Sequence, residues 1–243
     1  MKVSVGILVA VLPLALCWRP PSAIDWQSAR TILDEPSNQI VALTSDQVNS
    51  DLATLREHWE NAANFDCRRR ISASAPLPDC SAFVAAVCPE QNNPGTQEEV
   101  AAALGRVVDG FSALSGGKQN EDVIIRVVCD DQYTARCPKF HVDKIPARAM
   151  VTLLGRGTEF VAPPGSSSAG TVQTPCELEL VCLRGGTKWV ESKPSNSLST
   201  LFGRDSGLAA CEHRSPDGPP ERRVFLTLDL PTSKDEPEWL LHR

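Results

Sequence analysis

The chain has 243 residues, of which 42% are hydrophobic and 22% charged, so it can bury a core and has the composition of a globular protein. Its formal net charge of -6 argues against generic nucleic-acid binding, which depends on clustered lysine and arginine. The one tight basic run, three arginines at residues 68–70, is typical of a solvated surface. We therefore expect no nucleic-acid partner.

The N-terminus has the outline of a targeting segment. Lys2 precedes an apolar stretch over residues 3–18, which contains Pro13 and is followed by a polar and small segment ending at Ala23. The stretch is shorter than the roughly 20 apolar residues that a membrane-spanning helix needs. We predict that residues 1–23 are a secretory or organelle-entry signal, with no transmembrane span in the mature chain. The alternative is a buried N-terminal segment of the fold.

The sequence holds nine cysteines and four histidines. Loss of Cys17 with a signal would leave an even number of cysteines, which is compatible with disulfides in an oxidising compartment. Buried free thiols are equally compatible with this count. Two of the histidines, His58 and His242, are expected to face solvent and to take no part in a site.

Residues 24–118 are predicted to form a helical region. One helix is expected to start at Thr44 and a second at Thr96, each with a capping-box pattern. A short helix is expected over residues 80–88, capped by Asp79. Two apolar stripes at helical spacing support the longer helices, namely Val48, Leu52, Leu55 and Trp59, then Val100, Leu104, Val107, Phe111 and Leu114.

From residue 119 to 231 the hydrophobic period changes to that of short strands separated by glycine, proline and serine. Strands are predicted over residues 123–129, 149–154, 176–183 and 223–230. In the last of these, apolar residues at 224, 226, 228 and 230 alternate with Arg223, Phe225 and Thr227. The predicted fold class is α+β, with a double-stranded β-helix (jelly-roll or cupin-like) core behind the helical region, and residues 232–243 form a C-terminal tail.

Three possible metal ligands lie where these strands begin or end. His141 and Asp143 are two residues apart, so in an extended strand an imidazole and a carboxylate point the same way. His213 would complete a two-histidine, one-carboxylate face, which leaves coordination positions of an Fe(II) ion open. A carboxylate in an incomplete set favours iron over structural zinc.

Arg223 follows His213 by ten residues and opens a strand. This order, His-x-Asp, a later His and then a basic residue in a strand, resembles the Fe(II)- and 2-oxoglutarate-dependent dioxygenases, especially the prolyl-hydroxylase-like branch. The resemblance covers roughly residues 123–230. It implies that His141, Asp143 and His213 bind Fe(II), that Arg223 binds the distal carboxylate of 2-oxoglutarate, and that an unknown substrate is oxidised.

Four short segments of the sequence resemble, more closely, a bacterial family with a domain of unknown function. They are Cys-Pro-Lys-Phe-His-Val-Asp, Leu-Gly-Arg-Gly-Thr-Glu-Phe, Leu-Arg-Gly-Gly-Thr-Lys-Trp, and His-Arg-Ser-Pro followed by Arg-Arg-Val-Phe-Leu-Thr-Leu-Asp. Members of that family sometimes accompany zinc-homeostasis genes. This resemblance implies a fold and a site but no substrate.

Two other interpretations stay open. Cys137 and Cys211 lie close in sequence to the two histidines, so Cys137, His141, Cys211 and His213 could form a closed zinc site without catalysis. In that case Asp143 would lie behind the ligands. The third interpretation is a non-catalytic interaction protein on the same scaffold, because a fold does not fix a function.

Overall fold

The computed structural model of the chain describes residues 19–73, 78–87, 94–114, 122–164, 166, 169–186 and 210–231. The predicted C-terminal tail and all but the last few residues of the predicted targeting segment lie outside these ranges. The helices are α1 (Trp26–Asp34), α2 (Asp46–Trp59), α3 (Ser81–Val87) and α4 (Pro94–Ala113). The strands are β1 (Ser22–Ala23), β2 (Ile40–Leu43), β3 (Phe65–Ser72), β4 (Asp122–Tyr133), β5 (Ala147–Leu154), β6 (Glu159–Val161), β7 (Val172–Gln173), β8 (Leu180–Arg184), β9 (His213–Arg214) and β10 (Glu221–Asp229).

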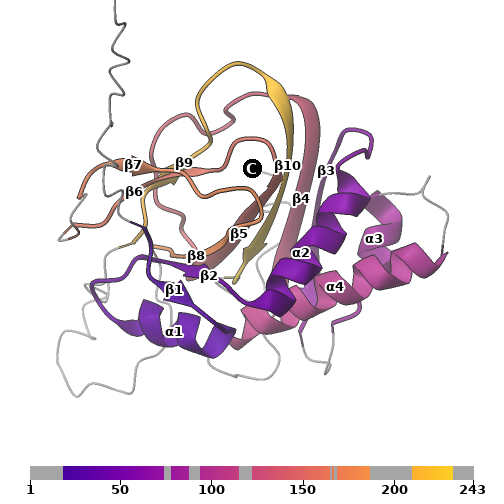
Figure 1. Cartoon of the computed structure of the whole chain (residues 1–243), viewed down its shortest axis with the longest axis horizontal. Helices are drawn as coiled ribbons and strands as arrows, with labels where there is room; N and C mark the ends of the chain where they lie inside the picture. The colour runs from indigo at the N-terminus through magenta and orange to yellow at the C-terminus, as the bar shows by residue number, and fades with distance from the viewer. Residues whose placement is uncertain are drawn as a thin grey trace, which may run out of the picture.

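These strands form two sheets. The large sheet has seven strands in the order β1-β2-β8-β5-β10-β4-β3, and the small sheet has three in the order β7-β6-β9. Only the β1–β2 pair is parallel among the pairings of the large sheet. The helices lie along one side of the large sheet and the small sheet lies on the other (Figure 1). This α+β arrangement around a jelly-roll core confirms the predicted fold class.

The main core lies between the helices and one face of the large sheet. On β10 the side chains of Val224, Leu226 and Leu228 are buried in this core together with Trp59 of α2 and Leu104 of α4. Because successive strand residues point to opposite faces, the intervening side chains of β10 point away from the helices. The predicted two-faced character of this strand is therefore confirmed.

The region predicted as helical also supplies strands to the large sheet. Strand β2 lies next to β8, and β3 pairs with β4 at the sheet edge. The arginine run at residues 68–70 lies in β3, so it is part of a strand rather than a plain solvated surface. Arg68 and Arg70 share the face that points away from the helices and pair there with Asp229 and Asp122, whereas Arg69 is exposed. Strand β1 overlaps the last two residues of the predicted targeting segment.

The predicted helices form, but their starts differ from the capping-box prediction. Helix α2 begins at Asp46 after Ser45, and the Thr44 hydroxyl donates to the Ala23 carbonyl instead of capping the helix. Helix α4 begins at Pro94, so Thr96 lies inside its first turn. The Asp79 cap is confirmed, since its carboxylate accepts from the Ser81 backbone N–H at 2.9 Å.

The prediction that His58 faces solvent is wrong, since its side chain is buried on α2 at 4% exposure, and His242 lies outside the described residues.

Seven cysteines lie in the described residues and all are free thiols, four of them buried. Within the same residues, no helix is both long enough and apolar enough to cross a membrane.

The placement of the core predicts the cost of removing a side chain from it. Leu226 is 1% exposed, so Leu226→Ala is expected to lower the free energy of unfolding by about 2–5 kcal/mol through lost burial and a cavity. Ile24 is 75% exposed, so Ile24→Ala should change it by less than about 0.5 kcal/mol. Urea denaturation of both variants measures the difference, and equal stabilities would contradict this core.

Candidate functional site

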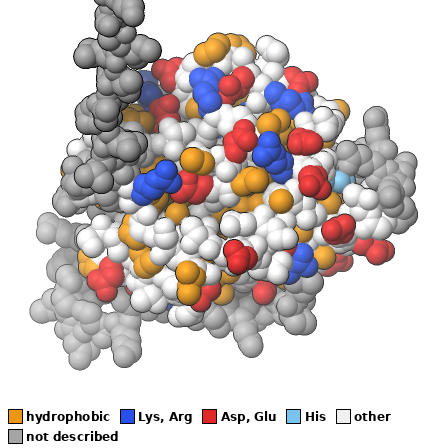
Figure 2. All heavy atoms as spheres, in the orientation of Figure 1, with side chains coloured by type: hydrophobic (Ala, Val, Ile, Leu, Met, Phe, Trp, Pro, Cys, Tyr) orange, Lys and Arg blue, Asp and Glu red, His pale blue; other side chains and the backbone are white. Residues whose placement is uncertain are grey.

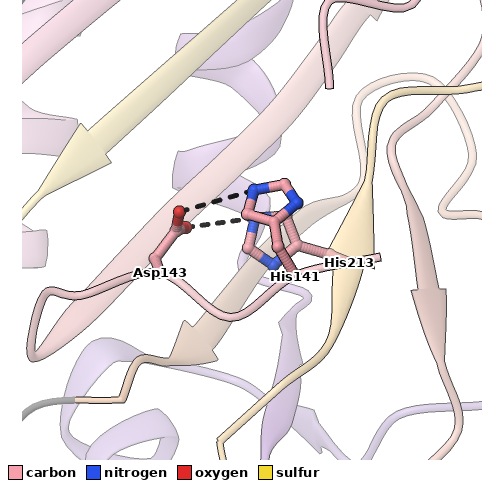
Figure 3. A group of neighbouring side chains, drawn as sticks. All are labelled: His141, Asp143 and His213. Atoms are coloured by element: carbon pink, nitrogen blue, oxygen red, sulfur yellow. Dashed lines mark ion pairs between the residues drawn. The ribbon is translucent and has the colours of Figure 1, made fainter. Parts of the chain in front are cut away.

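His141, Asp143 and His213 converge. One possible ligand atom from each lies within 4.8 Å of the others, and no other such group of three or more residues occurs in the described part of the chain. The Nε2 atom of His213 is 3.1 Å from Asp143 Oδ2, and that of His141 is 3.7 Å from Asp143 Oδ1. Figure 3 shows both imidazoles directed toward the same carboxylate.

The two histidines are brought together by their backbones. The His141 N–H donates to the His213 carbonyl and the His213 N–H donates to the His141 carbonyl, each at 3.0 Å. Residues directly opposite each other in such an antiparallel bridge project their side chains to the same face. The ring centroids are accordingly 4.6 Å apart. A single bridge thus joins β9 of the small sheet to the segment before β5.

Asp143 comes from a loop, not from the strand that the His-x-Asp spacing suggested. Only His141 has a bridge, and Asp143 follows it in irregular structure. The loop is held by the Gly186 N–H, which donates to the Asp143 carbonyl at 2.7 Å. A side chain at Gly185 would place its Cβ 1.9 Å from the Ile145 carbonyl oxygen. The glycine pair therefore permits the close approach of β8 that fixes this loop.

Backbone carbonyls set the proton positions of both histidines. The Nδ1 atom of His141 is 3.0 Å from the Lys139 carbonyl, and that of His213 is 3.3 Å from the Cys211 carbonyl. A carbonyl only accepts, so in the neutral rings Nδ1 carries the proton and Nε2 carries the lone pair. This is the arrangement in which a histidine is held as a metal ligand.

The site fits a metal ion by its own contacts. His213 Nε2 is buried, and the one polar group recorded near it is the Asp143 carboxylate, whose Oδ2 is 3.1 Å away. Ligand atoms each about 2.1 Å from one ion lie about 3–4 Å from each other, and the two histidine–carboxylate separations of 3.1 and 3.7 Å are in this range. Two nitrogens and one oxygen that leave other positions open are typical of non-haem Fe(II).

A buried ion-pair chain holds the Asp143 carboxylate. Arg148 Nη1 is 2.6 Å from Asp143 Oδ2, and the same guanidinium donates two bonds of 2.6 and 2.8 Å to Asp229. Burial raises the pKa of Asp143, but Arg148, His213 and His141 outweigh it and lower that pKa to about 2. The carboxylate is therefore ionised across the physiological range and oriented by Arg148.

Arg223 is a buried guanidinium without an acidic partner. Its side chain is 1% exposed, and Nη2 donates to Thr158 Oγ1 at 2.9 Å. The guanidinium also lies over the rings of Tyr133 and Phe225. Within the described ranges Arg223 forms no ion pair, and its buried Nε has no acceptor. Burial lowers the pKa of Arg223, because nothing there compensates fully for the loss of water.

One cavity joins these groups. It has a volume of about 230 Å³ and is lined by all three members of the triad and by Arg223, Phe225 and Thr227, among other residues. The Arg223 face of β10 thus lines the cavity, while the opposite face packs on the helices.

The cysteines of the alternative zinc set do not join this group. Cys211 is buried, and burial raises the pKa of its thiol to about 12. Cys137 is exposed at the cavity wall. Neither thiol is close enough to the histidines to form a joint ligand cluster in the part of the chain that the structure describes.

Sequence reasoning missed Arg148 and Asp229, which support the triad. The signal was present in the strand patterns, since Asp229 lies on the same alternating face as Arg223, Phe225 and Thr227. A charge at the end of the pocket face of a central strand needs a buried partner. The position of Arg148 opposite Asp229 in the β5–β10 pairing supplies it.

Comparison with known families places the sequence. Residues 41–229 match the family described as Protein of unknown function (DUF1826). The chain belongs to the DUF1826 family. No curated protein matches the sequence.

Two solved structures share the fold of this DUF1826 protein. The first is the rice dioxygenase for auxin oxidation, at 14% identity and a TM-score of 0.50 over 90% of this chain and 85% of that one. The second is JOX2 in complex with 2OG, Fe and JA, at 12% identity and a TM-score of 0.50 over 90% of this chain and 78% of that one. At such identities the likeness establishes the jelly-roll fold alone.

The geometry predicts which residues retain a metal. Zn(II) affinity, measured against a chelator, should fall at least about tenfold in His213→Ala and Asp143→Ala, since even the groups behind metal ligands contribute about 10–100-fold. Cys137→Ala and Cys211→Ala should keep the wild-type affinity because neither thiol reaches the triad. Zinc lost in Cys211→Ala but kept in Asp143→Ala would instead establish the closed cysteine–histidine site.

Proposed function

We propose that this DUF1826 protein is an Fe(II)- and 2-oxoglutarate-dependent oxygenase. The observation that carries the proposal is the pairing, in one cavity, of an open His-Asp-His triad with a buried guanidinium that has no acidic partner in the described residues. The triad offers ligands for Fe(II), and the guanidinium offers a counter-ion for a carboxylate. The jelly-roll fold shared with the rice dioxygenase and JOX2 agrees with this reading.

Arg223 is the residue proposed to bind the distal carboxylate of 2-oxoglutarate. A buried cation without a carboxylate is costly, and an arriving carboxylate would remove that cost through two charge-assisted hydrogen bonds. Thr158 would hold the guanidinium in place, and the rings of Tyr133 and Phe225 would fix its plane. The same rings would exclude water from the ion pair.

The remaining roles follow from the contacts of the triad. His141 and His213 would present Nε2 lone pairs because their Nδ1 protons are committed to backbone carbonyls. Arg148 would keep Asp143 ionised and oriented, and Asp229 would hold the Arg148 guanidinium in place. When bound, Fe(II) and 2-oxoglutarate would supply the oxidation of a substrate by O2 with release of succinate and CO2.

Two further proposals concern the N-terminal half of the chain. We propose that the apolar stretch over residues 3–18 directs the chain to a secretory route or an organelle. We also propose that residues 24–118 serve as the helical cover of the metal-binding region at residues 119–231, a role consistent with the shared core of helices and sheet.

Cosubstrate binding tests the function. Anaerobic addition of Fe(II) and then 2-oxoglutarate should give a visible charge-transfer band that needs both additions, and admission of air should produce succinate. The band should be absent in His141→Ala and Asp143→Ala. Protein that binds Fe(II) but shows neither the band nor succinate would contradict the oxygenase and favour a non-catalytic protein.

The role of Arg223 is tested by a matched pair of neighbours. Arg223→Gln should raise the Kd for 2-oxoglutarate about tenfold or more, because a charge-assisted hydrogen bond contributes about 1.5–3 kcal/mol. Arg222→Gln removes the same charge one residue away, where the side chain binds the Glu60 and Ala62 carbonyls instead of lining the cavity. Equal effects of the two substitutions on the Kd would contradict the assignment.

A further inference from the structure

The cavity carries a charge opposite to that of the chain. The protein has a formal net charge of -6, and the face seen in Figure 2 mixes acidic, basic and apolar side chains. The cavity lining, in contrast, contains six arginines and only two carboxylates. The arginines are Arg68, Arg126, Arg136, Arg148, Arg214 and Arg223, and the carboxylates are Asp143 and Asp229.

Five carboxylates neutralise most of these guanidiniums. Besides the two that line the cavity, Asp66, Asp130 and Glu159 form ion pairs with the arginines. Among the ion pairs of the described residues, Arg223 is the one cavity guanidinium that no carboxylate contacts, so the excess of one positive charge in this count lies there. Fe(II) and the dianion of 2-oxoglutarate would cancel each other, so the loaded site would still carry this excess.

The arginines that an anion can reach from solvent lie at one place. Arg126 on β4 and Arg136 after β4 have side chains that are 31% and 42% exposed, whereas Arg223 is buried. In the large sheet Arg126 lies between Arg68 of β3 and Thr227 of β10, both of which also line the cavity. The two exposed arginines therefore stand at the rim of the cavity, on the side of β3 and β4.

Asp66 shows that this pair of arginines accepts a carboxylate. Arg126 donates to its two oxygens through Nε at 2.8 Å and Nη2 at 2.7 Å, and Arg136 donates to Oδ2. This is the two-bond geometry by which arginine recognises carboxylates and phosphates. Asp66 is itself 34% exposed at the edge strand, so a competing anion has access to the same donors.

Resting on the proposed function, we infer that the substrate is a small molecule bearing a carboxylate or phosphate group, which Arg126 and Arg136 bind at the cavity rim in place of Asp66. The rest of the substrate extends into the cavity toward the triad. Arg223 is reserved for the cosubstrate, so the two anions are bound by different arginines of one cavity.

Binding of small anions to the full chain tests this inference without turnover. The protein is loaded with Zn(II) and saturated with 2-oxoglutarate, then titrated with phenylacetate, phenyl phosphate and the neutral phenylacetamide, with binding followed by ligand-observed NMR. The two anions should bind, and the amide at least about tenfold more weakly, as expected for a charge-assisted contact. The stronger of the two anions identifies the carboxylate or the phosphate as the preferred group.

Variants of opposite expected sign sharpen the test. Arg126→Gln and Arg136→Gln should weaken the anions at least about fivefold and leave the Kd of 2-oxoglutarate unchanged, while Asp66→Asn should tighten the anions because it removes the competing carboxylate. Arg70→Gln is the matched control. Like the two rim variants it removes one guanidinium, and Arg70 lies on the same face of β3 as Asp66. Arg70, however, pairs with Asp122 and does not line the cavity.

Each failure has its own signature. Anions that bind no better than the amide, that bind equally well to Arg126→Gln, or that compete with 2-oxoglutarate would overturn the inference. Anion binding at the rim in a protein that forms no succinate with Fe(II) would refute the oxygenase and leave the anion site standing. Succinate formation without any anion binding would do the reverse.

Discussion

The reciprocal backbone bridge between His141 and His213 is the contact on which the whole site depends. It joins residues 72 positions apart through two hydrogen bonds of 3.0 Å, and it sets both imidazoles on one face. Because those bonds are made by the backbone, the side chains stay available for other partners. The Nδ1–H group of His141 then donates to the Lys139 carbonyl, and that of His213 donates to the Cys211 carbonyl. The Nε2 atom of each ring therefore keeps its lone pair, and both Nε2 atoms face the Asp143 carboxylate.

Three glycines next to the site are required by the way its backbone segments pack. Gly185 and Gly186 let β8 approach the loop that carries Asp143, where any side chain at residue 185 would overlap the Ile145 carbonyl. Gly155 has a φ of +89° and lies against the Arg222 carbonyl, directly beside Arg223. The glycines thus allow the close backbone packing that positions Asp143 and Arg223. None of them would be recognised as part of a site from its own chemistry.

Sequence patterns predicted those parts of the molecule where one periodicity dominates. The stripes of α2 and α4, the two faces of β10 and the order of His141, Asp143, His213 and Arg223 could all be found, because each depends on spacing along the chain. Strands β2 and β3 could not, since a four-residue apolar strand has no resolvable period and β3 holds three arginines. The support of Asp143 by Arg148 and Asp229 depends on pairing between strands, which spacing within one strand does not encode.

The arginine content of the cavity follows from a single electrostatic constraint. Asp143 and Asp229 are 16% and 2% exposed at their side chains, and burying both as anions requires cations at contact distance. Arg148 bridges the two, and Arg68 adds a contact of 3.3 Å to Asp229. With these acids satisfied internally, Arg223 receives no carboxylate from the described residues, while Arg126 pairs with Asp66 and Arg136 pairs with both Asp66 and Asp130. The buried acids thus lie on the metal side of the cavity, and the arginines at its solvent-facing rim pair with the more exposed carboxylates of Asp66 and Asp130.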